Sequence, residues 1–149
     1  MSKLNKGLVL HMPLSQSWSK SATIATDKTP YENDGVIYGA TYTADRHGQP
    51  NSAMSFDGVD DYIDLGEKGL NFGNNQTISF WIKTSENSSR YKRIFATDSG
   101  NIYPYTIGFR SSKIEFTDED NIGEKGFPIT LNQWNHIVII PGGLGDNSC

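Results

Sequence analysis

Acidic and amide side chains gather at three places along the sequence, and each place could supply oxygen ligands to a metal ion. The three clusters are Asp27, Asn33 and Asp34; Asp57, Asp60 and Asp61; and Asp118, Asp120 and Asn121. Calcium prefers hard oxygen ligands of this kind, so we expect calcium as the cofactor if the chain binds one. Asp and Asn are also common turn residues, so turn stabilisation is the alternative for every cluster.

The third cluster begins like the calcium-binding loop of an EF-hand, with Asp118, Glu119 and Asp120. An EF-hand loop needs oxygen ligands at its fifth and twelfth positions. Ile122 and Ile129 stand there instead. The EF-hand interpretation is therefore excluded.

Aromatic side chains could add a second kind of chemistry, because they stack on sugar rings while neighbouring polar groups bond the sugar hydroxyls. The candidates in loop-like surroundings are Trp18, Tyr31, Tyr103 and Tyr105. Each alone is equally an ordinary surface aromatic, and two that converge on one surface would indicate a glycan site. Trp81 and Trp134 lie in strand-like segments, and we expect them to serve packing.

Catalytic arrangements are not evident. A glycosidase needs two carboxylates across a cleft, and Glu115 and Glu119 alternate along one segment without the closely spaced acidic motif of such enzymes. His11, His47 and His136 have no serine nucleophile in a glycine-flanked elbow. We therefore predict a non-enzymatic chain, with a glycoside hydrolase as the weakest alternative.

Composition excludes further classes. The 149 residues carry a formal net charge of −4, and the only basic cluster is Arg90 with Lys92 and Arg93, so nucleic acid is not an expected partner. The single cysteine, Cys149, allows no internal disulfide. The apolar run 8–14 is broken by His11 and Pro13, so no signal peptide or membrane span is predicted.

Short strands must position the candidate residues. Alternation is clearest over 76–84, where Ile78, Phe80 and Ile82 face one way and Trp81 the other. Loops are expected at 15–33 and 118–128. Further strands are expected at 8–12, 35–43, 52–56, 62–65, 93–97, 105–110, 113–117 and 134–140. Short strands at regular spacing predict an antiparallel β-sandwich or jelly roll, as one domain over residues 6–149 after a short tail, 1–5.

The segments 52–56 and 62–65 are predicted to form a hairpin around Asp57-Gly58-Val59-Asp60-Asp61. The Asp-Gly step can supply the positive φ that such a loop needs. Met54 and Phe56 would then share one face with Ile63 and Leu65 of the returning strand. A further short hairpin is expected at Ser111-Ser112.

This hairpin, with five other segments, resembles a laminin-G-like, concanavalin A-like jelly-roll domain. The other segments are 7–14, 27–35, 71–73, 77–84 and 134–139. The resemblance implies this fold, glycan binding through exposed aromatic and polar side chains, and loop oxygens that often bind calcium. Family members usually continue with further strands after the segment 134–140, whereas 141–149 has no strand pattern. The last strands are therefore expected to be incomplete, which would leave open sheet edges.

Two functions remain open. The first is a carbohydrate-binding or adhesion module, assisted by calcium, with a glycan as its partner. The second is a structural interaction domain of a cell-surface or viral-particle protein without a sugar site. An extracellular or particle-surface setting suits both. An exposed aromatic pair would favour the first function, and a flat polar face with an apolar open edge would favour the second.

Overall fold

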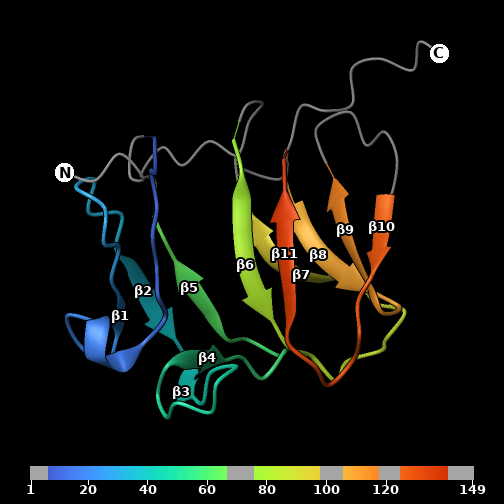
Figure 1. Cartoon of the computed structure of the whole chain (residues 1–149), viewed down its shortest axis with the longest axis horizontal. Coiled ribbons are helices and arrows are strands. Elements are labelled where there is room, and N and C mark those ends of the chain that lie inside the picture. Colours follow the sequence, from blue (N-terminus) through green and yellow to red (C-terminus); the bar gives the residue numbers. More distant parts are fainter. Residues whose placement is uncertain (1–6, 67–75, 98–105, 118–124, 141–149) are drawn as a thin grey trace. The chain divides into compact units, whose positions relative to one another are not determined.

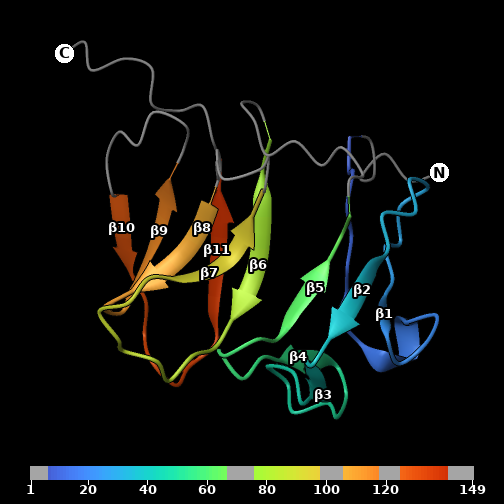
Figure 2. The same cartoon turned by 180° about the vertical axis from the view of Figure 1, so that it is seen from behind.

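The structure, a computed structural model, describes residues 7–66, 76–97, 106–117 and 125–140. All paired strands are antiparallel (Figures 1 and 2), so the predicted all-β, antiparallel β-sandwich class is confirmed. No described helix is long and apolar enough to cross a membrane. The chain divides into two compact units, Met1–Leu70 and Asn71–Cys149, which we describe separately. The single domain 6–149 stays a prediction, and the tail 1–5 and the end 141–149 lie outside the described residues.

Within its described residues, 7–66, the first unit holds two small sheets. A three-stranded sheet has the order β1 (Ile24–Ala25), β2 (Gly35–Tyr38), β5 (Tyr62–Asp64), and a two-stranded sheet joins β3 (Thr41–Thr43) to β4 (Ala53–Ser55). Burial alternates along β2 with the two-residue period of a strand. One face of this sheet is therefore buried and the other is exposed.

The predicted hairpin between segments 52–56 and 62–65 is wrong, because these strands pair with β3 and β2 respectively. Gly39 adopts a positive φ of 73°, which breaks the single strand expected over 35–43 into two. Each half then takes its own partner, and the loop 57–61 carries the chain from one sheet to the other. Phe56, which was expected to share one face with Ile63 and Leu65, is 46% exposed.

Two other predictions for this unit need correction. Residues 8–12 form no described strand, because side chains of the segment 27–33 take up the hydrogen bonds of Val9 and His11. The loop expected over 15–33 contains a short 3-10 helix, Gln16–Trp18, and the strand β1.

The second unit contains a two-stranded and a four-stranded sheet. The strands, in chain order, are β6 (Ile78–Ile82), β7 (Lys92–Ala96), β8 (Thr106–Arg110), β9 (Lys113–Thr117), β10 (Lys125–Pro128) and β11 (Asn135–Ile139). β6 pairs with β11, and the other four follow the order β10-β9-β8-β7. The strands expected at these places are confirmed, except that β10 falls in the expected loop 118–128. Ser111 and Ser112, both at positive φ, form the expected tight turn between β8 and β9.

The core of the second unit lies between these sheets. Phe80 of β6 meets Phe95 of β7 edge to face, with ring centroids 5.2 Å apart, and so joins the two sheets. Ile107 and Ile114 are each only 2% exposed. Gly108 has no room for a side chain, because a Cβ there would meet the Tyr91 ring and the Lys92 carbonyl oxygen. Close packing around β8 therefore holds this unit together.

Replacing Ile114 with alanine should lower the free energy of unfolding by about 2–4 kcal/mol, because a nearly buried aliphatic side chain leaves a cavity. Its cross-strand partner Phe127 is 64% exposed, so Phe127→Ala should cost about 1 kcal/mol or less. Urea denaturation of both variants measures the difference. Equal losses would contradict the assignment of Ile114 to the core.

Candidate functional site

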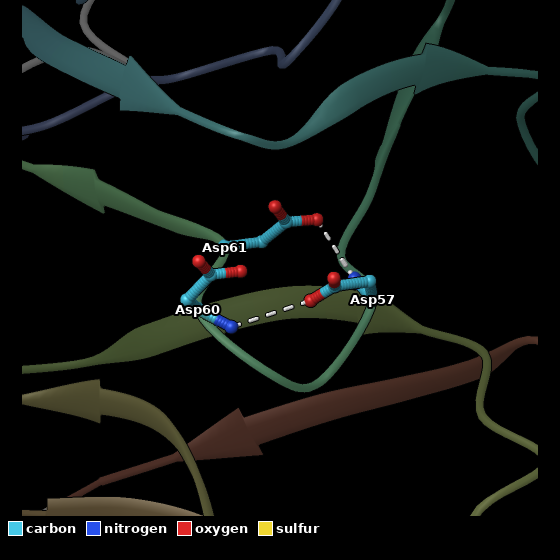
Figure 3. A group of neighbouring side chains, drawn as sticks. All are labelled: Asp57, Asp60 and Asp61. Atoms are coloured by element: carbon cyan, nitrogen blue, oxygen red, sulfur yellow. Dashed lines mark hydrogen bonds between the residues drawn. The ribbon is translucent and has the colours of Figure 1, made fainter.

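The loop 57–61 between β4 and β5 is shaped by its own carboxylates (Figure 3). Asp57 Oδ1 accepts hydrogen bonds from the backbone N–H groups of Val59, at 2.7 Å, and of Asp60, at 3.4 Å. Asp61 Oδ2 accepts a hydrogen bond from the Asp57 N–H at 2.8 Å. Gly58 takes a positive φ of 77°, as the Asp-Gly step predicts. Turn chemistry therefore explains part of this acidic cluster.

The same three residues, called the carboxylate triad below, also fit a metal ion. One ligand atom from each of Asp57, Asp60 and Asp61 lies within 4.8 Å of the others. Calcium binds oxygen at about 2.3–2.6 Å, so one ion can contact all three groups with small adjustments. In the part of the chain that the structure describes, this is the one group of three potential Asp, Glu, His or Cys ligands.

The triad also keeps free ligand atoms. Asp57 Oδ2, Asp61 Oδ1 and both carboxylate oxygens of Asp60 accept no hydrogen bond from any described residue. Asp57 and Asp60 are exposed and Asp61 is half-buried, so solvent or a ligand can reach the cluster. Three neighbouring carboxylates repel each other, and a bound cation would relieve that repulsion.

Asp61 is held against the bend between β2 and β3. A Cβ added at Gly39 would collide with Asp61 Oδ1, so glycine leaves room for this carboxylate in its present position. The positive φ of Gly39 adds a second reason for glycine at the same position. Gly39 therefore links the bend between β2 and β3 to the position of the Asp61 carboxylate in the triad.

The same unit carries a stacked aromatic pair, Tyr38 and Tyr62, called the tyrosine pair below. The two residues face each other across β2 and β5, with ring centroids 4.7 Å apart and an interplanar angle of 16°. They are 45% and 52% exposed. In the sequence, Tyr38 directly precedes Gly39 and Tyr62 directly follows Asp61. Sequence reasoning missed this pair, although both residues alternate outward, because it assigned the wrong strand partners.

Asp27 lies in a different setting, buried at 4% exposure. Its Oδ1 accepts hydrogen bonds from the backbone N–H groups of His11 and Thr29, both at 2.9 Å. Its Oδ2 accepts hydrogen bonds from the Thr29 hydroxyl at 2.6 Å and from the Asn33 N–H at 2.9 Å. Four donors thus converge on one carboxylate, which favours a structural role over metal binding.

The other two residues of this predicted metal cluster extend the same network. The Asn33 side-chain amide donates to the Val9 carbonyl oxygen at 2.9 Å. Asp34 Oδ1 accepts a hydrogen bond from the Asp27 N–H at 2.9 Å, and its Oδ2 pairs with Lys20 Nζ at 2.6 Å. The network ties the segment around Val9 and His11 to the loop before β2.

The aromatic residues that the sequence suggested as glycan contacts do not form a pair among the described residues. Trp18 is 56% exposed, with Lys28 Nζ 5.5 Å from its ring centroid, and Tyr31 is 64% exposed. No ring contact joins Trp18 to Tyr31 within the described ranges. Tyr103 and Tyr105 lie outside the described residues, as do Asp118, Asp120 and Asn121.

Burial alone would raise the pKa of Asp27, but the hydrogen bonds from the Thr29 hydroxyl and from the N–H groups of His11, Thr29 and Asn33 outweigh it. The pKa is therefore held below the ordinary value of 3.8. A carboxyl with a lowered folded-state pKa stabilises the fold above its unfolded-state pKa. That contribution is lost as the pH falls through the folded-state pKa.

We predict that Asp27→Asn lowers the free energy of unfolding at pH 7 by about 2–4 kcal/mol, because donors lose a charged acceptor in a buried site. As the pH falls below about 4, the stability of the variant should also decrease less than that of the wild-type chain. Urea denaturation between pH 2 and pH 7 measures both effects, with the exposed Asp60→Asn as control. A variant with the wild-type pH profile would argue against the network.

Comparison with known proteins adds the family. A laminin G family model, described as the concanavalin A-like lectin/glucanases superfamily, matches residues 57–144, which is more than half of the chain. The match begins at the first residue of the carboxylate triad and extends past β11. No curated protein and no solved structure matches the chain. With its antiparallel strands and this match, the chain belongs to the concanavalin A-like lectin/glucanases superfamily as a laminin-G-like domain.

Proposed function

We propose that this chain is a non-catalytic carbohydrate-binding module in which calcium assists glycan binding. The observation that carries the proposal is an exposed, stacked tyrosine pair whose Tyr62 directly follows the carboxylate triad in the chain. An aromatic surface and a loop with oxygen ligands for calcium are the two kinds of feature that such a module needs.

The triad supports calcium binding of modest strength. Its carboxylates supply oxygen ligands, while water or backbone carbonyl groups can complete a coordination number of about six to eight. Because Asp57 and Asp60 are exposed, the ligands are incompletely preorganised. We expect a dissociation constant of about 10⁻⁴–10⁻³ M, the range of exposed extracellular sites. A bound calcium ion would offer its open coordination positions to sugar hydroxyls.

The tyrosine pair supports sugar binding. The rings of Tyr38 and Tyr62 are already stacked, so little side-chain entropy is lost when a sugar packs against them. Their exposed surface can cover the C–H face of a pyranose ring. The phenol hydroxyls and the carboxylate of Asp64, also exposed on β5, can bond sugar hydroxyls.

A non-catalytic role is supported by the setting of Glu115. This carboxylate, one of the two considered for glycosidase chemistry, is 6% exposed and pairs with Arg110 at 3.1 Å. An ion-paired and buried carboxylate is badly placed to protonate or attack a glycosidic bond. Glu119, its sequence partner in that interpretation, lies outside the described residues.

A structural interaction domain is the second candidate, and one observation favours it. Val138 and Ile140, in and just after β11, are 52% and 67% exposed, and among the described strands β11 pairs only with β6. Exposed apolar side chains next to an open strand edge can accept a protein partner. Protein binding there would not require the triad or the tyrosine pair.

The proposal predicts that Asp60→Asn weakens calcium binding by about tenfold or more, because the loop loses one of three charged ligands. Asp45 is a matched control, since it is a half-buried turn aspartate that accepts bonds from the His47 and Gln49 N–H groups. Asp45→Asn should bind calcium as the wild-type chain does. Isothermal titration with calcium chloride measures all three proteins.

A glycan array, probed with and without EDTA, tests the sugar site in the same experiment. The double variant Tyr38→Ala/Tyr62→Ala should lose the calcium-dependent signals, whereas Tyr38→Phe/Tyr62→Phe, which keeps the rings, should retain most of them. If the wild-type chain binds neither calcium nor any glycan, the proposal is wrong. Calcium binding that raises the melting temperature without any glycan would make the ion structural.

A further inference from the structure

The outward face of β6 and β11 carries a second group of aromatic and polar side chains. His136 stands opposite Trp81, and Val138 opposite Ser79, in the antiparallel register. All four residues are exposed, while Ile78, Phe80 and Ile82 alternate to the other side, where Phe80 meets Phe95. The face formed by Ser79, Trp81, His136 and Val138 is called the outer face below.

Trp81 and His136 form a defined unit on this face. Their rings stack with centroids 4.8 Å apart and an interplanar angle of 19°. The Ser79 hydroxyl lies 2.9 Å from His136 Nε2, in hydrogen-bond contact. The imidazole is therefore fixed twice, by stacking and by a hydrogen bond. Trp81 stays 44% exposed despite the stacking.

The chemistry of this unit selects its ligand. A purely apolar partner would bury the Ser79 hydroxyl and the His136 ring away from water, which costs free energy. A sugar ring avoids that cost, because its C–H face covers the indole while its hydroxyls bond the serine and the imidazole. The alternation of ring surface and hydrogen-bonding groups thus matches a saccharide better than an apolar segment.

Within β6 and β11, no carboxylate offers itself to calcium on this face. The strands β6, Ile-Ser-Phe-Trp-Ile, and β11, Asn-His-Ile-Val-Ile, contain no aspartate or glutamate. None of the residues of the outer face belongs to the carboxylate triad or the tyrosine pair. Saccharide binding here would therefore persist after calcium is removed.

We propose that Ser79, Trp81 and His136 form a second, calcium-independent saccharide subsite on the outer face of β6 and β11. The subsite extends the proposed carbohydrate-binding function and can exist even if the calcium-assisted site does not. Trp81 provides the stacking surface, and Ser79 with His136 provides hydroxyl recognition.

The test uses the full chain on an array of defined neutral oligosaccharides in EDTA. The wild-type chain should retain glycans, and Trp81→Ala should reduce the signal by about tenfold. Trp81→Phe should keep more of the signal, because an aromatic ring remains. Phe127→Ala is the matched control, since it removes an exposed aromatic ring from β10, in the other sheet of the same unit, and should change nothing.

Tryptophan fluorescence gives a second readout, which is taken only from variants shown to be folded. Saccharide titration should shift the tryptophan emission of the wild-type chain and of Phe127→Ala, and this shift should disappear in Trp81→Phe, which keeps Trp18 and Trp134. Circular dichroism confirms that each variant is folded.

Three results would overturn the subsite. The first is a wild-type chain that retains no glycan in EDTA, even if it binds glycans in calcium. The second is equal EDTA-resistant binding by Trp81→Ala and Phe127→Ala. The third is a dimer, seen by sedimentation, that Trp81→Ala abolishes while no sugar binds, because the outer face would then contact a second copy of the chain.

Discussion

The contact between the Asp61 carboxylate and Gly39 determines the local structure on which the proposed site depends. Gly39 bends the chain at a positive φ, and its missing side chain leaves the space in which Asp61 lies. The bend sends β2 to the three-stranded sheet and β3 to the two-stranded sheet. Pairing of β2 with β5 then places Tyr38 against Tyr62. One steric requirement thus links the strand order, the acidic loop and the aromatic surface.

Two acidic clusters of similar composition take different roles because their burial differs. Asp27 is almost inaccessible, and four hydrogen-bond donors use its two oxygens, so its charge stabilises the fold. The triad is open to solvent, and several of its oxygens accept no hydrogen bond from described residues. Sequence alone cannot separate the two cases, since Asp and Asn favour turns in both.

Much of the fold was predictable because strand alternation is a local property. The alternation over 76–84 gave β6 with the correct inward residues, and the Ser111-Ser112 turn gave the β8–β9 hairpin. Strand pairing was less predictable, because one residue, Gly39, redirects two strands. The tyrosine pair depends on that pairing, so it could not be found beforehand. Trp81 was correctly placed opposite Ile78, Phe80 and Ile82, but it was expected to serve packing and is 44% exposed. Its stack with His136 joins segments far apart in the sequence.

The most direct measurement of the central claim is the calcium affinity of Gly39→Ala compared with Gly48→Ala. Both glycines have a positive φ, so alanine strains the backbone similarly at each, by about 1 kcal/mol. Only at Gly39 does the added Cβ collide with Asp61, whereas nothing lies within 4 Å of it at Gly48. Isothermal titration should show calcium binding lost or much weakened in folded Gly39→Ala and unchanged in Gly48→Ala. Wild-type calcium affinity in Gly39→Ala would contradict the account.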